Sequence, residues 1–325
     1  MLTKPFVLVV ATFISVVAAL SVWSVQSEGV RVIGVVTVSA PPSDFLFDSM
    51  RAGLHELGYI EGRDIRIEVR TAEGRVDRLP ALIEELLRLK ADILVISSSE
   101  GARAAKQATS TVPIVALLYN QDPMATGLIE SFNRPGGNLT GTTVRNFEHS
   151  GKRIQLLKEM IPGLSRIAVF WDSLSRVELQ GLSPAAHSLG IQLQFVELDQ
   201  SYDLDTAFKS AKSQRAGAVL VLTSPQFYVK SARLGALALE NKLPVASVFY
   251  ELTKAGGLMS YSTDPAENFH RSAYFIDRLL KGAKPSDLPF EQTENIKPTV
   301  NLKAADALGI KVPQSVLLRA DSIIR

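Results

Sequence analysis

A run of three serines carries the clearest candidate chemistry in the chain. Ser97, Ser98 and Ser99 are followed by Glu100 and Gly101, where a β-branched run gives way to a helical pattern. A serine at such a strand-to-helix turn is typical of the nucleophile of α/β hydrolases, which attacks an acyl carbon. The same turn suits a bound carboxylate, because hydroxyl and free N–H groups gather at the start of a helix. A plain helix cap is the third interpretation.

The sequence favours anion binding over catalysis at these serines. A strained nucleophile turn requires a very small residue where this chain has Ser97. A serine hydrolase also needs a histidine near the end of a strand, whereas His187 and His270 both fall within helical patterns. We therefore expect no enzymatic activity.

Carboxylates and aromatic rings follow other predicted strands. Asp122 and Asp172 come just after strand ends, where a carboxylate can pair with the ammonium group of a ligand. Each is equally a normal turn or cap residue. Tyr119, Trp171 and Tyr250 occupy similar places, where an aromatic ring either stacks on a flat ligand or packs at the rim of a site.

The loops after the strands together define a candidate ligand site. In open parallel sheets, ligands bind beyond the carboxyl ends of the strands. We expect such loops from two lobes to face each other across a cleft. The predicted ligand-binding residues are Ser39, Asp44, Ser97, Ser98, Ser99, Tyr119, Asp122, Trp171, Asp172, Ser173, Thr223 and Tyr250.

The chain has no motif for a nucleotide cofactor or a metal ion. The loop after the first strand (38–42) reads VSAPP and lacks the GxGxxG of dinucleotide sites, and no GxxxxGK[ST] occurs. The four histidines form no close-spaced pair and there is no cysteine. We predict no metal site and no cofactor. Because 35 basic residues nearly balance 33 acidic ones, we also expect no nucleic-acid partner.

The candidate loops need a scaffold of parallel strands, and the sequence predicts two. Strands are predicted at 31–38, 64–70, 93–97, 114–118 and 139–143, with helices at 44–57 and 75–89. The series begins again with strands at 166–171, 192–198, 218–222, 244–248 and 258–262, and helices at 151–160, 177–189, 204–215 and 228–241. Helices at 265–281 and 302–308 follow. This alternation indicates an α/β protein of two similar, doubly wound parallel-sheet lobes.

The length and the order of the elements predict how the lobes divide the chain. At 325 residues and 46% hydrophobic content, two domains are expected. A helix after the last strand of the second lobe suggests that the chain returns to the first. We assign residues 28–148 plus about 264–290 to the first lobe, and 149–263 plus about 291–325 to the second.

The N-terminal segment 1–27 has the order of a secretory signal. Lys4 precedes an uncharged apolar run (6–23), which is followed by a polar stretch. Small residues suit cleavage at Val25/Ser27 or, within the run, at Ala19/Ser21. The run is also about long enough, at roughly 18 residues, to remain as an uncleaved membrane anchor. Both alternatives export the rest of the chain, so we expect a periplasmic protein.

Several blocks of sequence resemble one protein family. They include GLHELGY (53–59), RPGGNLTG (134–141) and GGLMSY (256–261), together with the shorter segments 61–62, 87–90, 104–113, 151–152, 162–169 and 276–289. In this order, from about residue 31 to 325, they resemble the ABC-transporter substrate-binding family that includes tryptophan- and phenylalanine-binding lipoproteins. The resemblance implies a type I periplasmic-binding-protein fold, in which two lobes joined by hinge strands close on a small ligand and present it to an ABC permease in the inner membrane.

The chain departs from the family at the predicted site. Ser97, Ser98 and Ser99 replace a Gly-Thr-Pro-like turn, and Asp172 and Ser173 replace Asn-Pro. With no cysteine to carry a lipid, the resemblance favours a periplasmic protein. We predict a secreted, monomeric solute-binding protein for an amino acid or another small carboxylate. The alternatives are a ligand-sensing module of a membrane signalling system and, with less support, a hydrolase that uses Ser99.

Overall fold

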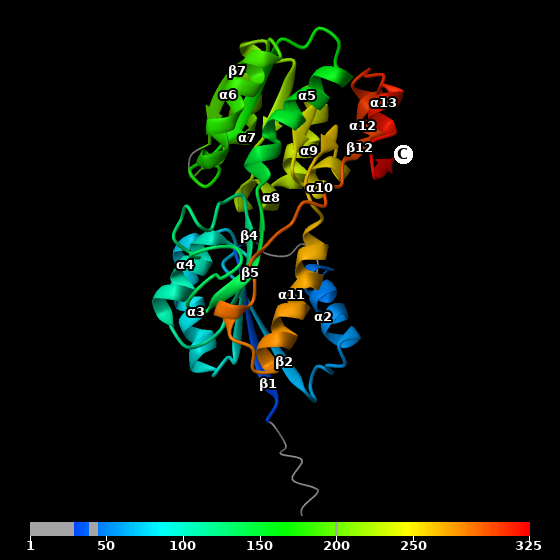
Figure 1. The fold of residues 1–325 in the computed structure, drawn as a ribbon. Helices are drawn as coiled ribbons and strands as arrows, with labels where there is room; N and C mark the ends of the chain where they lie inside the picture. Colours follow the sequence, from blue (N-terminus) through cyan, green and yellow to red (C-terminus); the bar gives the residue numbers. More distant parts are fainter. Residues whose placement is uncertain (1–28, 39–44, 199–200) are drawn as a thin grey trace, which may run out of the picture.

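The protein consists of two α/β lobes stacked along one long axis (Figure 1). The computed structural model describes residues 29–38, 45–198 and 201–325. The predicted signal or anchor segment 1–27 and the candidate ligand residues Ser39 and Asp44 lie outside the described residues. Within the described ranges, no helix combines the length and the apolar character that crossing a membrane requires.

The first lobe is built on a six-stranded sheet in the order β11-β5-β4-β3-β1-β2, with every neighbouring pair parallel. Its strands are β1 (Arg31–Thr37), β2 (Ile65–Thr71), β3 (Ile93–Ile96), β4 (Ile114–Tyr119), β5 (Leu139–Val144) and β11 (Glu291–Gln292). The central strand β3 is a run of Ile, Leu and Val that is buried throughout. Such runs are expected where helices cover both faces of a parallel sheet.

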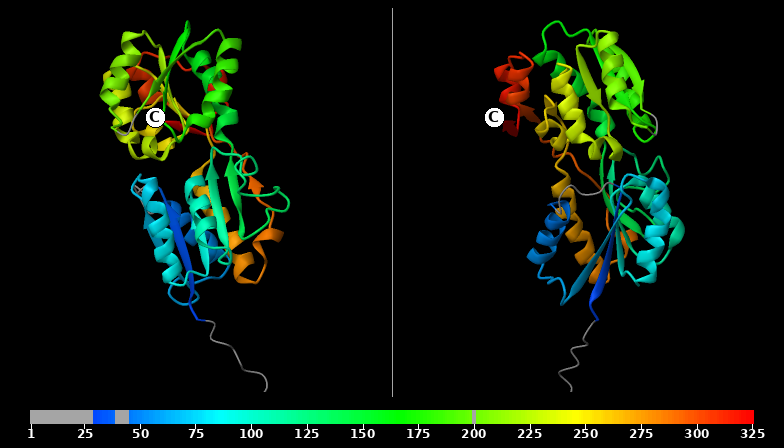
Figure 2. Two further views of the ribbon diagram at one scale, coloured as in Figure 1. Left: turned by 90° about the vertical axis from the view of Figure 1, so that its left-hand side faces the viewer. Right: turned by 180° about the vertical axis from the view of Figure 1, so that it is seen from behind.

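Four main helices cover the two faces of the first sheet. Helices α3 (Leu79–Arg88) and α4 (Ser99–Ala108) pack on one face, and α2 (Phe45–Glu56) and α11 (Pro265–Leu280) pack together on the other (Figure 2). Gly53 allows α2 and α11 to approach closely, because a Cβ at this position would lie 2.8 Å from the Cβ of Ala273. A helix from late in the chain thus completes the first lobe.

The second lobe is built on a seven-stranded sheet in the order β13-β12-β10-β9-β8-β6-β7. Its strands are β6 (Arg166–Trp171), β7 (Gln192–Glu197), β8 (Ala218–Val221), β9 (Val245–Ser247), β10 (Met259–Ser260), β12 (Thr299–Asn301) and β13 (Ser322–Ile324). The paired strands from β6 to β10 are parallel, whereas β12 runs antiparallel to β10. Strand β12 differs because the chain enters it directly from the other lobe, without a crossover helix on this sheet.

Helices also cover both faces of the second sheet. One face packs against α5 (Ser150–Met160), α6 (Leu179–Ser188), α12 (Leu302–Ala307) and α13 (Gln314–Leu317). The other packs against α7 (Leu204–Ser213), α8 (Pro225–Val229), α9 (Ser231–Glu240) and α10 (Tyr250–Lys254). The single helix predicted at 228–241 is two helices, separated at Lys230. Short 3-10 helices are η1 (Val76–Arg78), η2 (Asn146–His149), η3 (Arg176–Glu178) and η4 (Pro285–Asp287).

Three segments carry the described chain between the lobes: 145–149, 261–264 and 293–298, here called the hinge segments. The third hinge segment begins after β11, which belongs to the first sheet. The chain therefore crosses to the second lobe a few residues after the boundary predicted at about residue 291. The hinge segments also contact one another. Thr263 and Ile296 form an antiparallel bridge, and the Ser262 hydroxyl donates to the Asn146 Oδ1 at 3.0 Å.

Candidate ligand-binding site

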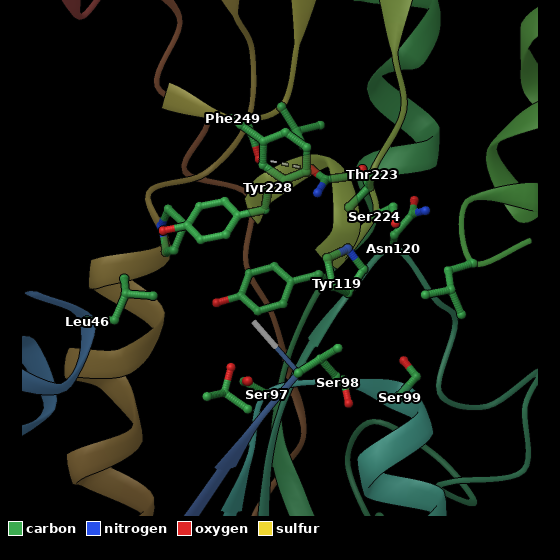
Figure 3. Close-up of a pocket in the computed structure, with 18 of the residues that line it drawn as sticks. Leu46, Ser97, Ser98, Ser99, Tyr119, Asn120, Thr223, Ser224, Tyr228 and Phe249 are labelled. Atoms are coloured by element: carbon green, nitrogen blue, oxygen red, sulfur yellow. Dashed lines mark hydrogen bonds between the residues drawn. The ribbon is translucent and has the colours of Figure 1, made fainter. Parts of the chain in front are cut away.

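A cleft opens between the lobes at the carboxyl ends of the strands (Figure 3). It contains about 1030 Å³ of space, counting the part that is open to solvent. Among the residues that line it, the first lobe contributes Ser97, Ser98, Ser99, Tyr119, Asn120 and Phe269. The second lobe contributes Leu174, Thr223, Ser224, Tyr228, Phe249, Tyr250 and Glu251. A cleft of this size fits a small organic ligand.

The serines lie together on the first-lobe side of the cleft (Figure 3). They follow β3 and begin α4, where Ser98 is the N-cap and its hydroxyl accepts from the Gly101 N–H at 3.0 Å. Ser99 is only 3% exposed, and its hydroxyl has no partner among the described residues. The first N–H groups of a helix have no acceptor within it, and this end of the helix dipole is positive. The serine turn can therefore bind a carboxylate.

Asn120 offers a free acceptor at the end of β4. Its φ of +71° lies in the left-handed region, which residues other than glycine rarely adopt. The side chain is buried, and Nδ2 donates to the Glu178 carboxylate at 2.9 Å. Within the described chain, neither the Asn120 Oδ1 nor the Thr223 hydroxyl from the second lobe has a partner. Buried polar atoms of this kind can pair with groups on a ligand.

Aromatic rings line a large part of the cleft. Tyr119 from the first lobe and Tyr228 from the second face each other, with their hydroxyls directed toward the same side (Figure 3). Tyr228 also packs edge to face on Phe249, with ring centroids 5.6 Å apart. Tyr250 and Phe269 extend the aromatic lining. These walls suit a flat or aromatic ligand.

Glu251 places a carboxylate beside this aromatic lining. It lies in the first turn of α10, close to the Tyr228 phenol. Burial raises the pKa of Glu251 above its ordinary value, and the negative charge of Asp264 raises it further. A carboxylate that is costly to ionise in the free protein is a typical feature of a binding site.

Replacing Glu251 with Gln is expected to stabilise the ligand-free protein at pH 8. Because the folded pKa of Glu251 lies above its unfolded value, ionising this group costs stability as the pH rises between the two values. Gln carries no charge, so the stability gain should vanish at acidic pH. Melting temperatures of both proteins between pH 4 and pH 8 test this. A variant that melts below wild type at every pH would contradict it.

The comparisons with known proteins identify the family. Residues 30–324 match the family described as ABC transporter substrate binding protein. The chain belongs to this family. It is 24% identical to the tyrosine-binding protein of Clostridioides difficile over 306 residues, which cover 91% of this chain and 87% of that protein.

Two solved structures of similar proteins support the fold of this substrate-binding protein. One is an ABC domain from Streptococcus pneumoniae in complex with L-Trp, with a TM-score of 0.82 and 23% identity over 91% of this chain and 100% of that chain. The other is a conserved domain protein from Vibrio cholerae, with a TM-score of 0.83 and 24% identity over the same shares. The predicted family and the predicted two-lobed, periplasmic-binding-protein-like fold are confirmed.

Half of the ligand residues predicted from the sequence line the cleft of this substrate-binding protein. They are Ser97, Ser98, Ser99, Tyr119, Thr223 and Tyr250. Four described residues do not line it, namely Asp122, Trp171, Asp172 and Ser173. The two others, Ser39 and Asp44, lie outside the described residues.

Asp122 and Trp171 have local structural roles in the substrate-binding protein. The Asp122 carboxylate accepts from the Met124 N–H at 2.9 Å and lies 3.6 Å from the Arg145 guanidinium. Trp171 belongs to the core of the second lobe, and the Arg176 guanidinium lies over its ring, 5.0 Å from the centroid. Strand ends thus carry turn and core residues as well as residues that line the cleft.

Asp172 is buried, and its carboxylate is hydrogen-bonded to other groups of the protein. Its carboxylate accepts from the Leu174 N–H at 3.0 Å and the Ser175 N–H at 2.9 Å. The Tyr202 and Ser224 hydroxyls also donate to it. The position assigned from the sequence to an ammonium contact is therefore filled by groups that organise the loops after β6 and β8.

The cleft is also lined by residues that were not among the ligand-binding residues predicted from the sequence. Asn120 and Glu251 directly follow Tyr119 and Tyr250, so their position after a strand was a usable signal. Tyr228 lies on α8 within the predicted helix, where spacing alone does not distinguish a cleft residue from a core residue. The contribution of such side chains depends on how the two lobes meet.

The surroundings of Ser99 differ from those of a hydrolase nucleophile. No histidine is among the described residues that line the cleft, so Ser99 has no imidazole beside it. His270 instead pairs with Glu56 at 3.0 Å on the outer side of α11. In the part of the chain that the structure describes, no cluster of His, Asp and Glu could hold a metal ion.

Proposed function

We propose that this protein is the solute-binding component of an ABC uptake transporter and binds an aromatic amino acid between its lobes. The observation that carries the proposal is the composition of the cleft. Among the described residues, the Ser99 hydroxyl at the start of α4 has no partner and suits a carboxylate, and the free oxygen of Asn120 suits an ammonium group. Aromatic rings line much of the same cleft. The names of the similar proteins, a tyrosine-binding protein and a complex with L-Trp, support the same ligand class.

The mechanism that we propose is closure of the lobes around the ligand. Gln226 of the second lobe donates to the Gly74 carbonyl of the first lobe, so this hydrogen bond bridges the two lobes. A ligand that contacts both lobes stabilises the closed state because it makes fewer contacts when the lobes separate. Closure would then present a defined surface to the transporter.

The proposal extends to location and partner. The order of charges and apolar residues in segment 1–27 supports export to the periplasm. The family supports an ABC permease in the inner membrane as the partner that receives the ligand. We propose that the protein acts there as a monomer.

Binding of aromatic amino acids by the mature protein tests the function. L-Trp, L-Tyr and L-Phe are compared with L-Ala in thermal unfolding and isothermal titration. At 100 times its dissociation constant, a ligand should add about 2.7 kcal/mol to the stability of the protein. If none of the three aromatic amino acids stabilises the protein, the proposed ligand class is wrong.

Replacing Ser99 with Ala should weaken binding of the amino acid found in this way by about 1.5–3 kcal/mol, the usual contribution of a hydrogen bond to a charged group. The variant should keep the stability of the wild type, because no described residue pairs with the Ser99 hydroxyl. Titration calorimetry of both proteins measures the difference. Equal affinities would place the ligand carboxylate elsewhere.

A further inference from the structure

Glu178 is a buried carboxylate at the junction of the two lobes, and it is not among the described residues that line the cleft. Its Oε1 accepts from the Asn120 Nδ2 at 2.9 Å and from the Thr223 N–H at 2.6 Å. Its Oε2 accepts from the Ser150 hydroxyl at 3.0 Å and from the Arg153 guanidinium at 3.2 Å. Asn120 belongs to the first lobe and the others to α5 and the second lobe. One carboxylate therefore joins groups from both lobes.

Arg153 connects this carboxylate to the hinge segments. It is fully buried, like Glu178, and the two form an ion pair. The same guanidinium donates to the Asn146 carbonyl at 2.9 Å and to the Tyr261 carbonyl at 3.1 Å. These carbonyls lie in two different hinge segments. The position of Glu178 is thus tied to the arrangement of the lobes.

Glu178 determines which end of the Asn120 amide is left without a partner among the described residues. An ionised carboxylate only accepts hydrogen bonds, so the Asn120 group that meets it must be the NH₂. The amide oxygen is then directed away from Glu178, and it has no partner within the described chain. Without a carboxylate in this place, the amide could turn and present either group to a ligand. The left-handed backbone of Asn120 holds the side chain at this point.

The free end of the Asn120 amide defines the chemistry of the ligand group that can pair with it. A buried amide oxygen needs a donor, and a protonated amine supplies N–H groups together with a favourable charge. The amide oxygen of Asn120 would repel a second carboxylate on the ligand. The Thr223 hydroxyl, also unpartnered in the described structure, lies on the same side of the cleft as Asn120 (Figure 3). This side of the cleft is therefore suited to an ammonium group.

We propose that Glu178 is a positioning residue that orients the Asn120 amide and thereby makes the site selective for ligands with a protonated amine. The inference rests on the proposed function of the cleft. Because Asn120 and Glu178 come from different lobes, the hydrogen bond that fixes the amide also joins the two lobes.

The test compares each amino acid with the same molecule lacking the amine. Dissociation constants are measured for L-Trp and indole-3-propionate, and for L-Tyr and 3-(4-hydroxyphenyl)propionate. Wild type should prefer the amino acid at least tenfold. In Glu178→Gln, the Arg153 guanidinium can only donate and should keep the Gln oxygen on its side, so the Gln NH₂ takes the place of the oxygen that accepted from Asn120 and from the Thr223 N–H. The Asn120 oxygen then turns toward this NH₂, and the preference should fall at least tenfold. Asn120→Gly, which keeps the left-handed backbone and removes the amide, should lose the preference to a similar extent.

Ser99→Ala is the matched control, because both members of each pair carry the carboxylate. It should weaken both ligands and leave their ratio within about threefold. An unchanged ratio in Asn120→Gly overturns the inference, as does a Glu178→Gln protein that loses affinity equally for both ligands. If Glu178→Gln does not fold, the inference is tested by the ratio of dissociation constants that Asn120→Gly shows for each amino acid and its analogue without the amine. Failure of wild type to bind any of the four molecules refutes the proposed function itself.

Discussion

Replacing Arg153 with Met is expected to lower the free energy of unfolding by about 3–5 kcal/mol, the usual cost of breaking a buried ion pair. Arg153 and Glu178 are both fully buried, so the substitution leaves a carboxylate without its counter-charge. The carbonyls of Asn146 and Tyr261 also lose their donor. Urea denaturation of the two proteins measures the difference.

A double variant and a surface control make this prediction specific. In Arg153→Met with Glu178→Gln, neither charge of the buried pair remains, so the double variant should be less destabilised than the sum of the two single variants. Arg63→Met removes a guanidinium from an exposed pair with Asp64 and should change the stability by no more than about 0.5 kcal/mol. Additive effects of the two buried substitutions would show that the pair is not coupled.

Replacing Asp172 with Ala is expected to cost about 3 kcal/mol of stability, because several buried donors lose their acceptor at once. These donors are two backbone N–H groups of the following loop and the hydroxyls of Tyr202 and Ser224. Asp172→Asn should cost less, since the amide oxygen still accepts from the Leu174 and Ser175 N–H groups. Denaturant unfolding of the three proteins gives the order.

The affinity of the Asp172→Asn protein separates a structural role from ligand contact. Asp172 is 1% exposed and does not belong to the described lining of the cleft. Its substitution by Asn should therefore change the affinity for the amino acid by less than about threefold, which corresponds to about 0.7 kcal/mol. A loss of tenfold or more would mean that the carboxylate pairs directly with the ammonium group of the ligand.

The sequence predicts the scaffold well because local patterns determine it. Runs of β-branched and aliphatic residues such as β3 recur with amphipathic helices between them, and this order alone indicates parallel sheets covered on both faces. The short antiparallel strand β12 follows no such pattern. It has only three residues, and its direction depends on how the chain crosses from one lobe to the other.

Part of the site also follows from local order. Ser97, Ser98 and Ser99 come directly after a strand and begin a helix, so their place at the cleft follows from the general rule for parallel sheets. The same rule selects Asp172, which the structure shows to be occupied by its own neighbours. A strand end is a position where a side chain can meet a ligand, and the surrounding groups determine whether it does.

Only the tertiary structure brings together the groups that give the cleft its chemical character. Glu178 lies 58 residues from Asn120 and 45 from Thr223 along the chain, and no spacing rule relates them. The left-handed backbone of Asn120 and the direction of its amide are likewise invisible in the sequence. The sequence by itself determines which strand ends carry polar and aromatic residues. The packing of two lobes around a shared carboxylate decides which of those polar atoms are left free for a ligand, because hydrogen bonds within the protein saturate the others.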